Sequence, residues 1–420
     1  MKVDVAIIGG GAAGLAAALH AYHESLTVLV IEREPSLGGI LNQCIHNGFG
    51  LHVFKEELTG PEYANRFIDL FMQKNIKFML STTVIDIKKE NHFSILASST
   101  EQGLMEIEAS AVILASGCYE RTRGAITIPG DRPKGIMPAG SAQRYLNIEG
   151  YLVGKNVFIL GSGDIGLIMA RRMTLEGAKV HGVAEIMPYS NGLTRNIVQC
   201  LDDFDIPLYL SHTITNIQGK DVLESVTISE VDSHFQPIKG TEKVFEVDTL
   251  LLSVGLIPDI TLFDSLNIET STITKSAVVN QHYQTNIEGL YVCGNALHVH
   301  DLVDWVTKES EKAGFCAKMY CLSQDKEPAL KNEKEVISGR NVRYTVPQKI
   351  DFAHLNSPID ISLRTTVKME KGRFTVFQNN QIIHTSVARY IAPAEMEHLT
   401  LHPDAFIDAA PITVELEEIV

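Results

Sequence analysis

The sequence has no excess of positive charge, no paired cysteines and no long apolar run, and each absence excludes a class of protein. Its formal net charge is −15, which argues against a nucleic-acid or anionic-membrane partner. No apolar run is long enough to span a membrane, and an expected strand directly after Met1-Lys2 leaves no room for a signal peptide. The six cysteines show neither a CxxC pair nor metal-ligand spacing, so we expect reduced thiols, no metal and a cytoplasmic location.

A glycine fingerprint occurs twice in the chain. The first copy, Gly9-Gly10-Gly11-Ala12-Ala13-Gly14, follows apolar residues 3–8 and precedes a helix predicted over 15–24. The second copy, Gly161-Ser162-Gly163-Asp164-Ile165-Gly166, is followed by a helix predicted over 167–176. In such a motif the first glycine permits a tight turn, the second lets the backbone approach a pyrophosphate, and the third lets the helix pack on the strand. Free N–H groups at the helix N-terminus then face the phosphates.

Each fingerprint is followed by an acidic residue at the end of the next strand. Glu32 lies 23 residues after Gly9, and Glu185 lies 24 residues after Gly161. A carboxylate at this place accepts hydrogen bonds from ribose hydroxyls and repels a 2′-phosphate, so Glu185 favours NADH over NADPH. The alternatives are a Gly-rich turn of an ordinary α/β protein for the fingerprint and a solvated strand end for Glu185. Two complete motifs predict two dinucleotides and hydride transfer between them.

The order of strands and glycines predicts an α/β fold with two Rossmann-like dinucleotide-binding domains and a small β-rich C-terminal domain. The first domain is discontinuous, over residues 1–125 and 270–325, and the second is inserted over residues 150–260. The β-rich domain is expected over residues 340–420.

Several local features support this division. A Pro- and Gly-rich connector over 128–150 marks the crossing between domains, and a charged stretch over 323–340 is expected to be a linker. In the first domain, separate strands are expected over 105–108 and 112–115. In the last domain, Asn379-Asn380 predicts a hairpin turn.

As an ordered set, these motifs resemble those of the two-dinucleotide flavoproteins of the pyridine nucleotide–disulfide oxidoreductase superfamily. The resemblance covers roughly residues 1–325 and implies FAD at the first site and NAD(H) at the second. For FAD it implies contacts from the first fingerprint, the first acid, several strand ends and the start of a late helix: Gly9, Gly11, Ala13, Gly14, Glu32, Arg33, Gly38, Gly39, Val84, Ala115, Ser116, Gly117, Gly294, Asn295, Asp301, Leu302 and Val303. For NAD(H) it implies contacts from the second unit: Gly161, Gly163, Asp164, Ile165, Gly166, Glu185 and Gly255.

The sequence departs from that family in two places. The late Gly-Asp motif, whose acid holds the ribityl chain of FAD, reads Gly294-Asn295 here. An asparagine can still hydrogen-bond a hydroxyl, so FAD binding is expected to survive. Members with a redox disulfide carry two neighbouring cysteines, whereas this chain has Cys44 alone after the Gly38-Gly39 doublet. We therefore expect an oxidoreductase without a redox-active disulfide.

A closer resemblance is to a bacterial subgroup of flavoprotein subunits, and it is carried by residues 38–50, 161–177 and 298–304. Such subunits accompany an anaerobic glycerol-3-phosphate dehydrogenase-like flavoprotein and a small cysteine-rich protein. Related subunits occur in opine-oxidase and cyanide-synthase type complexes. The resemblance therefore implies two partners, a flavoprotein dehydrogenase subunit and a small cysteine-rich subunit. The β-rich segment is either the docking surface for the dehydrogenase subunit, or a cap or homodimer contact.

Two clusters have competing interpretations. Cys44 and His46 could approach the flavin as a thiolate and an imidazolium, although a packed, inert cysteine is the commoner case. The stretch His298-Val299-His300-Asp301 has two histidines but no cysteine in range, which disfavours a metal. We expect Asp301 instead to cap a helix over 302–321, with Asp304 in its first turn and its N–H groups facing the flavin.

The sequence thus predicts an FAD-dependent oxidoreductase that exchanges hydride with NAD(H) and relays electrons with a dehydrogenase subunit of a glycerol-3-phosphate dehydrogenase-like complex. Hydride transfer depends on positioning more than on acid–base catalysis, so no general base is assigned. One alternative is a free-standing NADH oxidase or quinone reductase. Another is a largely structural subunit that holds flavin for folding.

Overall fold

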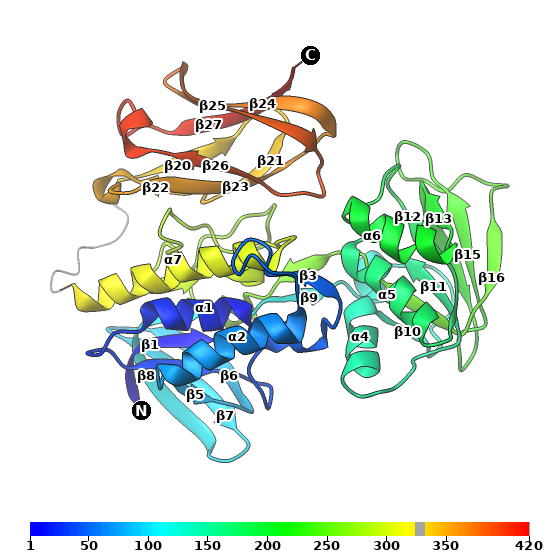
Figure 1. The fold of residues 1–420 in the computed structure, drawn as a ribbon, viewed down its shortest axis with the longest axis horizontal. Coiled ribbons are helices and arrows are strands. Elements are labelled where there is room, and N and C mark those ends of the chain that lie inside the picture. Colours follow the sequence, from blue (N-terminus) through cyan, green and yellow to red (C-terminus); the bar gives the residue numbers. More distant parts are fainter. Residues whose placement is uncertain (324–331, 420) are drawn as a thin grey trace. The chain divides into compact units, whose positions relative to one another are not determined.

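The computed structural model describes residues 1–323 and 332–419, and its contacts divide the chain into two compact units (Figure 1). Unit 1 comprises Met1–Asn42, Asn47–Cys118 and Pro258–Val420, whereas unit 2 comprises Gln43–His46 and Tyr119–Ile257. Unit 2 is therefore an insertion into the sequence of unit 1.

In the described part of unit 1, a seven-stranded mixed sheet forms the base. Five strands run parallel in the order β5-β2-β1-β8-β19, and β7 and β6 continue the sheet antiparallel to β8. The central strands are buried on both faces, as parallel strands covered by helices usually are. The strands are β1 Lys2–Ile8, β2 Val28–Ile31, β5 Lys77–Met79, β6 Thr82–Lys89, β7 Phe93–Ser99, β8 Gly103–Leu114 and β19 Leu290–Val292.

Three helices pack on this sheet: α1 (Ala12–Ala21), α2 (Gly60–Gln73) and α7 (Val303–Leu322). Helix α1 lies between α7 and α2 (Figure 1). The contact of α1 with α7 is made by small residues, since a Cβ added at Gly314 of α7 would overlap the carbonyl oxygen of Ala17 in α1. The backbones of the two helices are therefore in contact. This contact holds α7, which follows the return of the chain from unit 2, against the helix that begins at the first fingerprint.

Two predicted boundaries in unit 1 were wrong. The strands expected over 105–108 and 112–115 are one strand, β8. Its first half alternates exposed and buried residues, such as Glu106 and Ile107, whereas its second half is buried on both faces. The change of pattern within one strand looks like a break in the sequence. Helix α1 also begins at Ala12 and not at residue 15, because fingerprint residues form its first turn.

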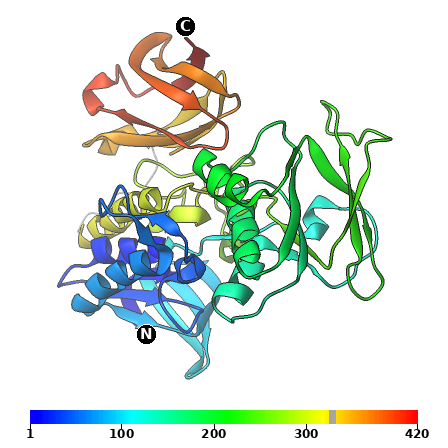
Figure 2. The same cartoon turned by 45° about the vertical axis from the view of Figure 1, so that its right-hand side comes forward.

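Unit 2 is built on a parallel sheet of order β10-β17-β11-β12-β13. Helices cover one face and a small antiparallel sheet, β14-β15-β16, covers the other (Figure 2). Alternate residues of β11 supply the two cores: Val157 and Ile159 face the helices, whereas Phe158 and Leu160 face the antiparallel strands. The elements are β10 Ile136–Pro138, α4 Ala139–Asn147, β11 Asn156–Leu160, α5 Asp164–Leu175, β12 Lys179–Glu185, α6 Thr194–Cys200, β13 Leu208–Leu210, β14 His212–Gln218, β15 Ser225–Glu230, β16 Lys243–Glu246 and β17 Thr249–Leu252.

The connector expected over 128–150 is part of unit 2. It supplies strand β10, which pairs with β17, and helix α4. Pro133 and Gly135 precede the strand, so turn residues at its start concealed a short, half-buried edge strand.

The end of the chain forms two facing sheets with a shared apolar core. One sheet has the order β22-β20-β27-β24-β25 and the other β21-β23-β26. Asn379 and Asn380 both have positive φ (49° and 61°) between β24 and β25, which confirms the predicted hairpin turn. The strands are β20 Glu333–Ser338, β21 Val342–Val346, β22 Lys349–Asp351, β23 Ile359–Thr365, β24 Met369–Gln378, β25 Gln381–Ile391, β26 Glu397–Leu401 and β27 Ile412–Glu418.

The linker expected over 323–340 is partly wrong. Residues 324–331 of it lie outside the described residues, but Glu333–Ser338 forms β20 and pairs with β27 and β22. Three consecutive charged residues, Glu333, Lys334 and Glu335, begin this strand and gave the sequence its linker-like composition.

Short elements complete the fold. They are β3 Asn47–Phe49, β4 Leu58–Thr59, β9 Cys118–Glu120, α3 Arg123–Ile126 and β18 Leu256–Pro258.

We predict that Gly314→Ala lowers the free energy of unfolding by about 1–3 kcal/mol, the usual cost of overpacking, because the new methyl group must push α7 away from Ala17. Denaturant unfolding of the full chain measures this. Gly124→Ala in α3 is the matched control, since its Cβ would lie 3.7 Å from Thr122 Oγ1, an ordinary contact. Equal stability of the two variants would contradict the packing described for α1 and α7.

Candidate functional site: two nucleotide motifs and the start of helix α7

The first fingerprint forms a tight turn between β1 and α1. Gly9 has a φ of +105°, and a Cβ there would overlap the carbonyl oxygen of Ala115, the residue that follows β8. A Cβ at Gly14 would overlap the carbonyl oxygen of Gly9. The turn therefore requires glycine at both places, and it lets α1 begin directly behind the strand.

The N-terminus of α1 is open. Its N-cap is Gly11, with no side-chain cap and no acid in the first turn, where Ala13 and Gly14 lie. A Cβ at Gly11 would meet only Gly39 Cα, at 3.8 Å, and Gly38 N–H donates to Gly10 O at 2.9 Å. The glycine doublet thus lies beside the fingerprint. A positive helix end framed by backbone without side chains fits a pyrophosphate.

Glu32 is fixed at the end of β2. Only 6% of the residue is exposed, and its carboxylate accepts the N–H groups of Gly10 (2.6 Å) and Glu34 (2.8 Å). Arg33 beside it is exposed, whereas Val84 on β6 is buried. The acid is therefore held against the fingerprint by the fingerprint's own backbone, at the place where a ribose hydroxyl would be recognised.

The residues that follow β8 lie at the same edge of the sheet as the first fingerprint, because β8 runs parallel to β1. Ala115 is buried behind Gly9, and Ser116 Oγ donates to the carbonyl oxygen of Asp259 at 2.6 Å. A Cβ at Gly117 would meet nothing within 4 Å. The segment that enters unit 2 and the one that returns are thus joined by a hydrogen bond beside the predicted FAD contacts Ala115, Ser116 and Gly117.

The late Gly-Asn motif is bound to its own loop and to α7. Gly294 N–H donates to the carboxylate of Glu309 at 2.7 Å. Asn295 Oδ1 accepts the N–H of His300 at 3.0 Å, and its amide nitrogen lies 3.7 Å from Cys118 Sγ. Glu309 was not identified from the sequence. It lies 15 residues after Gly294, so no short sequence motif connects the two residues.

Asp301 is not the helix cap that we expected. Helix α7 begins at Val303, its N-cap is Leu302, and no side-chain cap is present. The Asp301 carboxylate instead pairs with the guanidinium of Arg364 on β23 and accepts the N–H of Met396 at 2.7 Å. A largely buried arginine attracts the acid more strongly than a helix N–H does, so the residue joins the C-terminal sheets to this loop.

Asp304 lies in the first turn of α7, as expected, but it serves a neighbouring loop. It is 1% exposed and accepts the N–H groups of Gly50 (3.2 Å), His52 (3.0 Å) and Val53 (2.7 Å). The ring of Trp305, the next residue, lies between those of His52 and His398. The loop after the glycine doublet is therefore anchored on the helix start.

The second fingerprint repeats the first in unit 2. Gly161 has a φ of +96°, a Cβ there would overlap the carbonyl oxygen of Ser253, and the N–H of Gly166 donates to Ser253 Oγ at 3.1 Å. Gly163 is the N-cap of α5 and has no side-chain cap. Gly255, after the closing strand β17, is exposed. Ser253 was not among the predicted contacts, yet it fixes the fingerprint turn.

Glu185 occupies the place that corresponds to Glu32. It is 4% exposed and accepts the N–H (3.0 Å) and hydroxyl (2.7 Å) of Ser162 and the N–H of Met187 (2.9 Å). A solvated strand end does not describe this buried, hydrogen-bonded carboxylate. The residue between the first two glycines is thus a further member of the motif.

Asp164 in the first turn of α5 organises the segment before α6. Its carboxylate accepts the N–H of Leu193 at 2.8 Å and the side-chain amide of Asn196 at 2.7 Å. The neighbouring Ile165 packs on the helix-side core of unit 2. The acid therefore closes a loop beside the fingerprint.

Cys44 and His46 belong to unit 2 in their contacts. The Cys44 thiol donates to Gln143 Oε1 at 3.9 Å, and burial raises its pKa to about 12. Burial, together with Arg195 and Arg171, lowers the pKa of His46 to about 4. Both groups are therefore neutral near pH 7, which does not fit a thiolate–imidazolium pair. All six cysteines are among the described residues, and no disulfide joins them.

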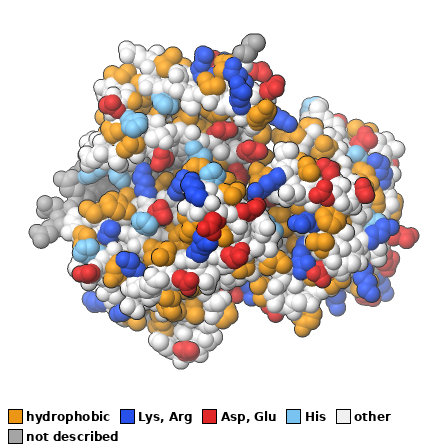
Figure 3. Space-filling view, viewed as in Figure 1, with side chains coloured by type: hydrophobic (Ala, Val, Ile, Leu, Met, Phe, Trp, Pro, Cys, Tyr) orange, Lys and Arg blue, Asp and Glu red, His pale blue; other side chains and the backbone are white. Residues whose placement is uncertain are grey.

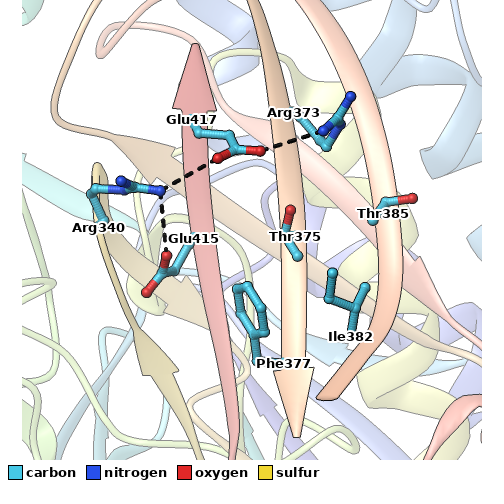
Figure 4. Close-up of a pocket in the computed structure, with 8 residues that line it drawn as sticks. All are labelled: Arg340, Arg373, Thr375, Phe377, Ile382, Thr385, Glu415 and Glu417. Carbon is cyan, nitrogen blue, oxygen red and sulfur yellow. Dashed lines mark hydrogen bonds and ion pairs between the residues drawn. The ribbon is translucent and has the colours of Figure 1, made fainter. Parts of the chain in front are cut away.

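A recess of about 450 Å³ lies elsewhere, on the face of the C-terminal sheet opposite its core (Figure 4). Arg340 lies within ion-pair distance of Glu415 and Glu417, and Arg373 approaches Glu417 at 3.5 Å. The charges of the two arginines and two glutamates balance, so the recess has no net charge that would attract a charged ligand. None of the nucleotide motifs lines it.

Charged residues of both signs are interspersed with apolar ones on the face that Figure 3 shows, in keeping with the composition. Among the described helices, none combines the length and the apolar character that a membrane span requires.

Comparison with known proteins identifies the family. The model of the pyridine nucleotide-disulphide oxidoreductase family matches residues 3–311, so the chain belongs to this family. Members of the family use FAD and NAD(P)H, which confirms a flavin and a pyridine nucleotide as the cofactors. The geometry of the two motifs agrees with this assignment.

Two relatives are parts of larger enzymes. The chain is 25% identical over 290 residues to hydrogen cyanide synthase subunit HcnB of Pseudomonas protegens, with 64% of this chain and 60% of the relative covered. It is 22% identical over 312 residues to an opine oxidase subunit of Agrobacterium tumefaciens, with 70% of this chain and 61% of the relative covered. The chain thus matches about three fifths of each relative's length, and the expected resemblance to this group is confirmed.

Among solved structures, thioredoxin reductase of T. acidophilum has a TM-score of 0.64 at 24% identity, covering 77% of this chain and 99% of its own. This likeness confirms the fold class, with two Rossmann-like domains.

We predict that Glu185→Gln lowers the ratio of kcat/KM for NADH to that for NADPH by about tenfold. A hydrogen bond to a charged acceptor contributes about 1.5–3 kcal/mol, and the variant keeps the shape but loses the charge that repels a 2′-phosphate. Initial rates with both nucleotides measure the ratio. Glu176→Gln, an exposed acid of the same unit, is the control. An unchanged ratio would remove Glu185 from the nucleotide site.

We also predict that Asp304→Ala speeds amide hydrogen exchange at residues 50–53 at least about tenfold. Three N–H groups, that of Gly50 buried and those of His52 and Val53 part-buried, then lose their acceptor, and an unsatisfied buried donor costs about 1–3 kcal/mol. Mass spectrometry of the peptide that contains these residues records the rate. Asp69→Ala on the exposed face of α2 should leave it unchanged. Equal protection in the two variants would show that Asp304 does not anchor this loop.

Proposed function

We propose that the chain is an FAD-dependent oxidoreductase that transfers hydride between NAD(H) and FAD. In this proposal it relays electrons with a partner dehydrogenase subunit of a glycerol-3-phosphate dehydrogenase-like complex. The observation that carries the proposal is that the same motif occurs twice. In each glycine turn a backbone N–H donates to one buried carboxylate: Gly10 to Glu32 and Ser162 to Glu185. One chain with two such motifs supports two bound dinucleotides.

FAD and NAD(H), when bound, supply the hydride-transfer chemistry. The chain's own residues bind and orient. The open N-termini of α1 and α5 receive phosphates, and Glu32 and Glu185 accept ribose hydroxyls. Asp304 fixes the start of α7 and the loop beside it. Because positioning provides most of the rate enhancement in hydride transfer, no acid–base residue is needed.

The absence of a cysteine pair in the sequence supports electron relay to another protein, because a dithiol relay needs two neighbouring sulfurs. Relatives that are named as subunits support a partner protein, and the resemblance implies a second flavoprotein subunit and a small cysteine-rich subunit. Strand β25 is an edge strand with exposed Ile382, Val387 and Tyr390, and we propose the β-rich domain as the surface for such a partner. Co-purification of the native protein tests this part of the proposal.

Anaerobic stopped flow tests the hydride step. We predict that NADH bleaches the flavin absorbance of the FAD-loaded chain in a single turnover, and that the bleached flavin is reoxidised slowly by dioxygen. A flavin that stays oxidised with NADH contradicts the proposal and favours a structural, flavin-holding subunit. Steady NADH consumption with dioxygen at the rate of flavin reduction identifies a free-standing NADH oxidase instead.

A further inference from the structure

Three potential metal ligands converge beside the late glycine motif. His298 Nε2 lies 2.8 Å from Glu309 Oε2, and His300 Nε2 lies 3.5 Å from the same oxygen. The side chains are 1%, 1% and 5% exposed, and the two imidazole rings are 4.2 Å apart. The histidines come from the loop after Asn295 and the acid comes from α7, so the fold and not the sequence spacing brings them together.

We propose that His298, His300 and Glu309 bind one divalent first-row transition-metal ion of the Zn²⁺ class. Metal–nitrogen and metal–oxygen bonds of about 2.0–2.2 Å at tetrahedral angles place neighbouring donors about 3.3 Å apart. The two Nε2–Oε2 separations, 2.8 and 3.5 Å, bracket that value, and all three donor atoms lie within 4.8 Å of one another. Imidazole and carboxylate donors suit such ions, and two histidines with one carboxylate are a known metal-binding set.

The two histidine rings have unused hydrogen-bonding capacity in this cluster. Both histidines turn Nε2 toward one carboxylate oxygen, and the buried Nδ1 atoms of His298 and His300 have no partner in the structure. A single oxygen therefore accounts for the orientation of two imidazoles. An ion between Nε2 and Oε2 would hold both rings directly and would replace this shared acceptor.

Local charge favours a cation. Around the start of α7, the carboxylates of Asp301, Asp304 and Glu309 are largely buried, and Arg364 is the cation that pairs with one of them.

The ion would act as a structural link. The other oxygen of Glu309 accepts the N–H of Gly294, so one side chain would connect the metal, helix α7 and the late glycine motif. The proposal does not depend on the proposed function, because the three side chains are not among the predicted nucleotide contacts and metal binding is read out without turnover.

The test is metal content and metal titration of the full-length chain. We expect one Zn²⁺ per chain by elemental analysis of protein purified without an affinity tag of histidines. After removal of the ion with a chelator, Co²⁺ should bind at one equivalent and give the visible absorption bands of a four-coordinate site. His300→Gln and Glu309→Gln should each weaken Co²⁺ binding by about 100-fold or more, since even outer partners of metal ligands contribute 10–100-fold.

His398→Gln is the matched control. His398 is a histidine of the same region with a buried, unpartnered Nε2, but its ring packs at a tilt against Trp305 and it is not one of the three ligands. This variant should retain full Co²⁺ binding. Far-ultraviolet circular dichroism checks that every variant folds, and if Glu309→Gln does not fold, His300→Gln decides. Less than a tenth of an equivalent of bound metal, or binding that survives both His300→Gln and Glu309→Gln, overturns the proposal.

Discussion

The hydrogen bond from a glycine-turn N–H to a buried strand-end carboxylate is the interaction on which both nucleotide motifs depend. In unit 1 the bond joins Gly10 to Glu32, and in unit 2 it joins Ser162 to Glu185. A carboxylate that is 4–6% exposed is costly unless it is hydrogen-bonded, and each acid also accepts a second N–H from the residue two positions further on. The strand end, the turn and the helix start are thereby fixed relative to one another.

The start of helix α7 organises the rest of unit 1. Asp301 connects it to the C-terminal sheets through Arg364, and Asp304 connects it to the loop after the glycine doublet. Glu309, two turns along, connects it to Gly294. Three acids on and before one helix therefore hold three segments that are distant in the sequence. The close contact of Gly314 with Ala17 places this helix against α1. Because α1 begins within the first fingerprint, α7 and the segments bound to it are held next to that motif.

Much of this could be predicted from the sequence because it is local. The glycines, the two acids and the parallel strands follow from short patterns whose physical requirements leave few other residue types possible. The roles of Asp301, Asp304 and Glu309 could not be predicted, because their partners are distant in the sequence. Arg364 lies 63 residues from Asp301, Val53 lies 251 residues from Asp304, and Gly294 lies 15 residues from Glu309. A helix cap was the best local explanation of Asp301, and a buried arginine on another sheet overrode it. Likewise, the bounds predicted for β8 and β20 were wrong. The residue types in these strands change where the burial of the side chains changes, although the backbone continues as a strand.

The central claim is that each motif holds its own dinucleotide. Counting nucleotides on the full chain tests this most directly: released FAD is measured by its absorbance, and NADH binding to the FAD-loaded protein is measured by calorimetry under anaerobic conditions. The account predicts one FAD and, at the same time, one NADH per chain. Displacement of FAD by NADH, or FAD-loaded protein that binds no pyridine nucleotide, would contradict it.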